Sequence, residues 1–218
     1  MARQRDEEKR IAILLAAARV IAEQGLGAPT AKIAKAANVA DGTLFVYFPS
    51  KDILLNELYL HLKAELSSRV FASVSSSADL RTQLHGIWKT WTGWGVQDPA
   101  KRRALAQLSV SDKITAGSRE KGLEGVAPLV ELISKASALG PMRDAPVVFV
   151  GSALEAMAAT TMDFMAREPA AAAKFCEWGF EAMWGALTAK SSPAVAAHDK
   201  AREPKGLSAA ADRRRRSK

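Results

Sequence analysis

The sequence has very little of the residues on which disulfides, metal sites and many catalytic sites depend. Its 218 residues include one cysteine, Cys176, and three histidines, His61, His85 and His198. A single cysteine cannot form an intramolecular disulfide, and we interpret it as a buried small residue, with a redox sensor as the alternative. The histidines have no metal-ligand spacing, and Cys176 has no histidine near it in sequence. We therefore expect no cofactor and no metal.

The alternation of apolar and polar residues that marks β-strands is also missing, although 48% of the residues are hydrophobic and permit a sizeable core. The apolar run at 11–21 follows three acidic residues, contains Arg19 and repeats at helical spacing, which indicates the first helix of a soluble protein rather than a signal peptide. The run at 145–165 carries Glu155 and Asp163, which favours a buried or interface helix over a membrane span. A cytoplasmic location is expected.

Basic charge is concentrated at the two ends of the chain. The net formal charge of +8 divides into +3 for residues 1–51, zero for 52–190 and +5 for 191–218. This division is typical of a protein whose ends meet a polyanion and whose body meets something else. The tail has few large apolar residues and ends in a run from Arg213 to Arg216, so we expect disorder there. It is either a solubilising end or a tether attracted to DNA phosphates.

The most informative stretch is residues 30–51, TAKIAKAANVADGTLFVYFPSK. Its first half places Ile33, Ala34 and Ala37 on one helical face, with Thr30 as the expected N-cap. Asn38 is suited to the left-handed conformation of a tight turn. These features predict a short helix followed by a turn.

The second half predicts another short helix that begins at Asp41 and turns Leu44 and Phe48 inward at a spacing of four residues. Pro49 disfavours helix at the residue before it, and Ser50 can cap the helix that follows. Two short helices joined in this way form a helix-turn-helix, whose second helix is shaped to enter a DNA major groove.

The run GTLFVYFPSK resembles the GT(L/I)Y-x-(Y/H)F-x-(S/N)K signature that closes the DNA-binding domain of TetR-family transcriptional regulators. The T-x-x-I-A-x-x-A-x-V pattern before it, from Thr30 to Val39, has the spacing of the same family, and the motif-level similarity covers residues 9–60. Three positions depart from the family pattern: Phe45 replaces the usual tyrosine, Val46 replaces a common aromatic, and Ala40 replaces a small capping hydroxyl. The resemblance implies an all-α protein with an N-terminal three-helix DNA-binding domain, an effector-binding body and dimerisation through the last two helices.

The candidate DNA-binding residues lie on and beside the second helix. Thr43 can hydrogen-bond a base or a phosphate, Phe45 can contact a thymine methyl, and Gly42 permits close backbone approach. Asp41 is either a first-turn acid that favours the helix N-terminus or an acceptor for a cytosine amino group. Tyr47 and Lys51 are candidate phosphate contacts. Lys51 is unfavourable with the dipole of the next helix unless a phosphate approaches it, the alternative being a solvated lysine. The full set is Thr30, Asp41, Gly42, Thr43, Phe45, Val46, Tyr47 and Lys51.

Beyond Lys51 the sequence predicts helices throughout the body, at about 52–72, 80–94, 99–114, 128–139, 146–167 and 169–190, which gives nine helices in the chain. The serine-rich segment 73–77 is expected to form a bend, and the glycine-containing stretch 115–125 a loose connection. The predicted domains are a helix-turn-helix domain at 1–51, completed by the start of the fourth helix, a helical effector-binding and dimerisation domain at 52–190, and a disordered basic tail at 191–218.

Two groups of apolar residues in the body are candidates for function. The effector candidates are large residues that can equally be core packing: Trp88, Trp91, Trp94, Phe149, Met157 and Met162. Because the body has no net charge, an uncharged or weakly charged hydrophobic or aromatic ligand is expected. The dimer candidates combine small residues with large apolar ones, with an intramolecular contact as the alternative: Gly151, Ala158, Phe175, Gly179, Phe180, Ala182, Met183, Trp184 and Leu187.

The sequence therefore predicts a ligand-responsive transcriptional regulator, expected to be a repressor, that binds a near-palindromic DNA operator as a homodimer and is released by a small-molecule effector. Two alternatives remain open. The chain could bind DNA without sequence preference through its basic ends, or it could be an all-helical enzyme with the tryptophan-lined body as its active site.

Overall fold

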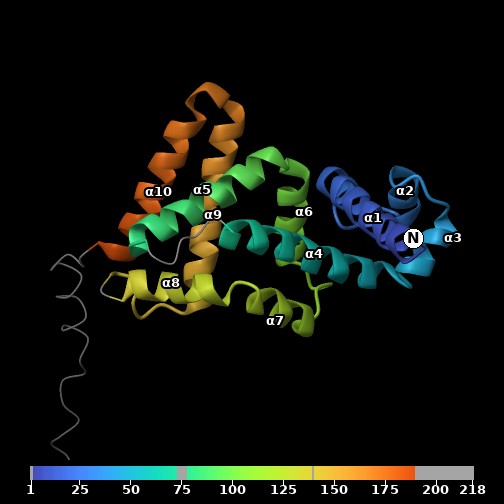
Figure 1. The fold of residues 1–218 in the computed structure, drawn as a ribbon, viewed down its shortest axis with the longest axis horizontal. Helices are drawn as coiled ribbons and strands as arrows, with labels where there is room; N and C mark the ends of the chain where they lie inside the picture. Colours follow the sequence, from blue (N-terminus) through green and yellow to red (C-terminus); the bar gives the residue numbers. More distant parts are fainter. Residues whose placement is uncertain (1, 73–77, 139, 190–218) are drawn as a thin grey trace, which may run out of the picture.

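The computed structural model describes residues 2–72, 78–138 and 140–189. These residues form ten α-helices and one 3-10 turn and contain no strand, which confirms the all-α prediction for the described part of the chain (Figure 1). The predicted bend at 73–77 and the arginine-rich tail at 191–218 lie outside the described residues. The elements are α1 (Ala2–Gln24), α2 (Thr30–Ala36), α3 (Asp41–Tyr47), α4 (Lys51–Ala72), α5 (Leu80–Gln97), α6 (Pro99–Ser109), α7 (Ala116–Glu124), α8 (Ala127–Ser137), α9 (Val147–Arg167), η1 (Pro169–Ala171) and α10 (Ala172–Thr188).

Helices α1 to α3 form a small head at one end of the molecule, and α4 runs from this head into the body (Figure 1). Ile33 of α2, Leu44 of α3 and Phe48 just after α3 are buried in the core of the head, as their spacing predicts. Asn38 has φ of 55°, the left-handed conformation expected at the turn between α2 and α3. The two helices therefore form the predicted helix-turn-helix.

The start of α2 differs from the prediction. Pro29, with φ −65° and ψ 143°, occupies the N-cap position, and Thr30 is the first helical residue rather than the cap. The fixed φ of proline suits this extended conformation directly ahead of a helix. At the start of α3 the cap position is held by Ala40, and Asp41 in the first turn supplies a negative charge that interacts favourably with the helix dipole.

Buried apolar residues of the described chain form two clusters. The first joins α1 to α4 with α6, which contributes Ala104, Leu105 and Leu108, and it includes Trp94 at the end of α5. The second joins α5, α8, α9 and α10 around Trp88 and Phe180. The first core thus contains residues from both sides of residue 51, the predicted domain boundary that the start of α4 completes. Helix α6 packs against α1 and α4.

The region after α6 contains more helix than the sequence predicts. Helix α6 ends at Ser109 instead of residue 114, and the stretch expected to be loose forms α7. The hydroxyl of Thr115 caps α7 by accepting from the amide of Ser118 at 3.2 Å. A Cβ on Gly122 would lie 2.9 Å from the Tyr59 ring, so glycine here lets α7 lie directly on α4. The described residues therefore hold ten α-helices instead of nine.

Among the described residues, α9 is the one helix long and apolar enough to cross a membrane when judged by length and composition. One of its faces is buried inside the molecule through Val150, Leu154 and Ala158. Its other face, including Phe149 and Phe164, is exposed. Helix α10 lies beside it after the η1 turn (Figure 1).

Candidate nucleic-acid interface and ligand cavity

Helix α3 presents an exposed face on the side opposite the head core. Leu44 and Phe48 are buried, whereas the side chains of Phe45 and Val46 are 44% and 78% exposed. Asp41 and Gly42 are also exposed, and Thr43 is half-buried. A Cβ on Gly42 would meet none of the described atoms within 4 Å, so packing inside the described chain does not require glycine at this position. The predicted base-contacting residues therefore share one accessible surface.

Lys51, predicted as a phosphate contact, has a partner that sequence reasoning missed. Its Nζ donates to the backbone oxygen of Ala28, in the connection between α1 and α2, at 2.6 Å. This bond ties the start of α4 to the head and fixes the position of the ammonium group. Lysine has three N–H donors, so Lys51 can hold this carbonyl and bind a phosphate at the same time.

Tyr47, the other predicted phosphate contact, also has an internal partner. Its hydroxyl donates to Oδ1 of Asp6, on the first turns of α1, at 3.0 Å. Desolvation, followed by the hydrogen bond to Asp6 and the charge of Asp6, raises the pKa of Tyr47 above its ordinary value of 10.0. The phenol therefore keeps its proton at neutral pH. Nearby, Arg10 forms an ion pair with Glu57 of α4 and lies over the Phe48 ring.

A cavity of ≈ 90 Å³ lies between α5, α8, α9 and α10. Its lining is apolar and consists of Leu84, Ile87, Trp88, Trp91, Leu129, Ile133, Gly151, Leu154 and Met183. Two predicted effector residues, Trp88 and Trp91, belong to it. Leu84 and Ile87 share their helical face and could have been found from that spacing, whereas the sequence contains no local signal for Leu129 and Ile133.

The other predicted effector residues lie elsewhere. Trp94 is buried in the first core, and its Nε1 donates to Glu65 Oε1 of α4 at 3.2 Å, because six residues along a helix rotate it away from Trp88. Met162 is buried against Gly95, and Phe149 is 60% exposed on α9. Met157 lines a second site, on the α9–α10 surface. These four residues therefore lie outside the cavity that Trp88 and Trp91 line.

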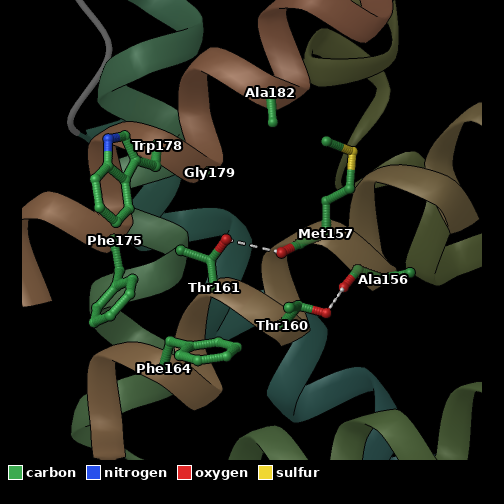
Figure 2. A pocket seen from close by; sticks show the side chains of 9 residues that line it. All are labelled: Ala156, Met157, Thr160, Thr161, Phe164, Phe175, Trp178, Gly179 and Ala182. Carbon is green, nitrogen blue, oxygen red and sulfur yellow. Dashed lines mark hydrogen bonds between the residues drawn. The ribbon is translucent and has the colours of Figure 1, made fainter. Parts of the chain in front are cut away.

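This second site is an open groove of ≈ 440 Å³ between α9 and α10, lined by Ala156, Met157, Thr160, Thr161, Phe164, Phe175, Trp178, Gly179 and Ala182 (Figure 2). The rings of Phe164 and Phe175 lie 5.3 Å apart, and Trp178 packs edge-on against Phe175 at 5.8 Å. The hydroxyls of Thr160 and Thr161 donate to carbonyls of their own helix, as the dashed lines in Figure 2 show. The groove is therefore predominantly apolar.

The groove contains three of the predicted dimer residues, Phe175, Gly179 and Ala182, and two aromatic residues that sequence reasoning missed. These are Trp178 and Phe164, whose side chains are 57% and 41% exposed. Four predicted dimer residues are instead buried inside the chain, because they lie on the inward faces of their helices: Ala158, Phe180, Met183 and Leu187. Gly151 lines the cavity, and Trp184 stacks on Phe180 beneath the guanidinium group of Arg81.

A polar network connects α4, α5 and α6 between the cavity and the head. The Glu65 carboxylate accepts from Lys101 Nζ at 2.9 Å as well as from Trp94, and it pairs with Arg69. Burial alone would raise the pKa of Glu65, but the hydrogen bonds from Lys101 and Trp94 and the charges of Lys101 and Arg69 hold this pKa below its ordinary value. Next to Lys101, Arg102 pairs with Asp163 of α9 at 2.7 Å. Helix α6 is thus attached to both α4 and α9.

Comparisons with known proteins agree with this architecture. The family model of "Bacterial regulatory proteins, tetR family" matches residues 13–58, which contain the helix-turn-helix. Nucleoid occlusion factor SlmA of Haemophilus influenzae is 32% identical over 76 residues, 35% of this chain and 35% of that protein. The chain thus spans about a third of the length of the curated relative it matches.

Structural similarity extends over most of the chain. A crystal structure described as that of a TetR-family transcription regulator from Shewanella sp. PV-4 has a TM-score of 0.73 and 29% identity, covering 84% of this chain and 99% of that one. The TetR-like transcriptional regulator LfrR from Mycobacterium smegmatis, solved in complex with proflavine, shares the fold with a TM-score of 0.61 at 19% identity, covering 80% and 94% of the two chains. Residues 13–58 thus match the DNA-binding part of the tetR family, and the chain as a whole has the fold of TetR-family regulators.

Proposed function

We propose that the protein is a transcriptional repressor that binds a near-palindromic operator as a homodimer and leaves it when an apolar small molecule occupies the body. The observation that carries this proposal is the exposed face of α3. Phe45 and Val46 are exposed on a helix whose other face is buried, and Gly42 in the first turn of this helix has open space where a Cβ would lie. A helix of this kind fits a major groove, where apolar side chains contact thymine methyl groups. Such a protein acts in the cytoplasm, where bacterial DNA lies.

The apolar groove between α9 and α10 supports a homodimer. It exposes Trp178 and Phe164 side by side with Phe175, and monomeric proteins rarely leave contiguous apolar patches of this kind in water. A second copy of the same surface covers such a patch around a twofold axis, since an isologous interface is self-complementary. Two heads related by that axis read two half-sites, roughly 34–36 Å apart when the sites are one helical turn from each other.

The cavity lined by Trp88 and Trp91 is the proposed effector site. Its volume of ≈ 90 Å³ is smaller than the roughly 300–1,000 Å³ of common ligand pockets, so the effector is either very small or opens the cavity by moving α8. The apolar lining favours an uncharged hydrophobic or aromatic molecule. One turn beyond Trp91, Trp94 joins the Glu65 network of α4 and α6, which supplies a physical route from the cavity to the head.

For such a ligand to release DNA, it must bind the DNA-free conformation better than the DNA-bound one. By linkage, operator binding then weakens effector affinity by the same factor. A ligand that binds tightly in the cavity with no effect on operator affinity would contradict the effector role and leave the DNA-binding role intact.

The experiment that tests the proposed function distinguishes residues that contact DNA bases from a residue that contacts only the phosphate backbone. We propose to select a duplex with the protein from a random pool and to measure affinity for it and for a mixed-sequence duplex by fluorescence anisotropy across a salt series. Thr43→Ala and Phe45→Ala should each weaken the binding free energy by ~1–3 kcal/mol, mainly for the selected duplex, because they remove base contacts. Lys51→Met should weaken both duplexes alike and lower the log–log salt slope of the dimer by about 2, since each phosphate contributes about 0.9.

Lys135→Met on α8 is the matched control, because it removes the same charge at the far end of the body (Figure 1). It should leave both affinities unchanged. Equal losses on both duplexes for Thr43→Ala, Phe45→Ala and Lys51→Met would show that α3 does not read sequence. That result would favour DNA binding without sequence preference through the basic ends.

A further inference from the structure

The first two turns of α1 extend past the core of the head. Residues 4–9 are exposed, and the first buried residue of the helix is Ile13. The hydrogen bond from Tyr47 to Asp6 places these turns beside the C-terminal end of α3, at the head of the molecule (Figure 1). An acidic side chain therefore lies at the edge of the surface proposed to meet DNA.

The hydroxyl of Tyr47 cannot serve Asp6 and a phosphate as donor at the same time. A phenol has one O–H proton, and both a carboxylate and a phosphate oxygen act as acceptors. In the structure this proton is donated to Asp6. Lys51 is different, because its ammonium group has further donors after it bonds to Ala28. Of the two proposed phosphate contacts, Tyr47 must change its partner on binding DNA, whereas Lys51 need not.

We propose that Asp6 attenuates DNA binding by holding the Tyr47 hydroxyl away from the phosphate backbone. The inference rests on the proposed function, since it requires that the α3 surface binds DNA. Asp6 acts through Tyr47 and is therefore a positioning residue. Its negative charge adds a general repulsion of phosphate, which any acidic residue nearby would share.

The test compares Asp6→Ala with Glu8→Ala in two backgrounds. Both substitutions remove one negative charge and its acceptor oxygens from an exposed residue of the same helical turns, and Glu8 is bonded to Gln4 instead of to Tyr47. Asp6→Ala should tighten binding of the dimer to both the selected and the mixed-sequence duplex by roughly fourfold to a hundredfold more than Glu8→Ala does, because one exposed hydrogen bond is worth a factor of about two to ten and each of the two protomers frees one. In a Tyr47→Phe background the two substitutions should have equal effects.

A second measurement reads the hydrogen bond without DNA. The chain has two tyrosines, Tyr47 and Tyr59, so NMR of labelled tyrosine rings can follow both during an alkaline titration. Asp6→Ala should lower the pKa of Tyr47, because the bond to Asp6 and its charge raise it, and should leave the pKa of Tyr59 unchanged. Glu8→Ala should lower the pKa of Tyr47 less than Asp6→Ala does.

The outcomes separate this inference from the proposed function. Equal gains in DNA affinity for Asp6→Ala and Glu8→Ala in the wild-type background would overturn the role of Asp6, as would an excess gain that persists in the Tyr47→Phe background. In both cases the wild type still binds DNA, and the proposed function stands. A wild-type protein that binds neither duplex overturns the proposed function and the inference together.

Discussion

Gly179 lies where α10 approaches α9 and α5 most closely, and replacing it with alanine tests that packing. A Cβ on Gly179 would lie 2.8 Å from Trp88 Cζ2 and 2.9 Å from Thr161 Cγ2. Trp88 is 2% exposed, and its Nε1 donates to the backbone oxygen of Cys176, one turn before Gly179, at 3.0 Å. The indole is thus buried and bonded to α10, and Gly179→Ala must push α10 away or displace Trp88 and Thr161.

The magnitude follows from two opposing effects. Overpacking of a well-filled core costs ~1–3 kcal/mol, while replacing glycine by alanine within a helix stabilises by ~0.5–1 kcal/mol. Gly93→Ala on α5 is the matched control, because a Cβ on Gly93 would meet none of the described atoms within 4 Å. Both variants gain the same helix propensity, so the difference between their free energies of unfolding is the overpacking cost. We expect Gly93→Ala to be more stable than Gly179→Ala by ~1–3 kcal/mol.

Urea unfolding followed by far-UV circular dichroism measures this difference. The protomer concentration must be the same for all samples, because dimerisation contributes to the apparent stability. The m-value should stay constant, so that a change in midpoint reports stability alone. Two variants of equal stability, or a Gly179→Ala variant more stable than the control, would refute the close approach of α10 to Trp88.

Three further predictions concern the groove, the cavity and the polar network. Trp178→Glu and Ala182→Arg place a charge in the proposed dimer interface and should yield monomers in light scattering; dimers of both variants with an intact fold would show that the groove is not the interface. Gly151→Leu should fill the cavity and weaken binding of the uncharged dye Nile red by about tenfold or more, with Gly93→Ala unchanged; equal binding would place the dye elsewhere. Glu65→Gln should destabilise the fold at neutral pH. Because the folded pKa of Glu65 is depressed, its stabilisation is present above the ordinary value of 4.5 and is lost as the pH falls through the folded value, so the wild type and variant should converge in acid unfolding curves. A difference that stays constant with pH would contradict the role assigned to the charge of Glu65.

The sequence by itself determined the helix-turn-helix, because the signals there are local. The left-handed Asn38, the extended Phe48 ahead of Pro49 and the inward spacing of Leu44 and Phe48 each depend on residues within four positions. Backbone sterics and helical periodicity act over that distance whatever the rest of the chain does. The family signature occupies the same stretch, so motif and local physics identify the same site.

The faces of the body helices were decided by tertiary packing. Helices α9 and α10 carry apolar residues on two sides, so periodicity alone could not tell Phe180, which is buried, from Trp178, which is exposed. Helical rotation turns Trp94 away from the cavity, but only the packing of α4 against α5 places Glu65 where it accepts from the Trp94 N–H. The expected loose stretch formed α7 because Gly122 fits against Tyr59.

Contacts between residues far apart in the chain were equally beyond local reasoning. Tyr47 and Asp6 are separated by 41 positions, and Lys51 and Ala28 by 23, yet both pairs meet at the head. Side-chain spacing predicts which residues face the DNA surface, but only the packing of α1 and α4 on α3 determines which partners those residues already hold. The sequence thus determined the candidate DNA surface, and the tertiary structure decided which residues of that surface already hold a partner inside the chain.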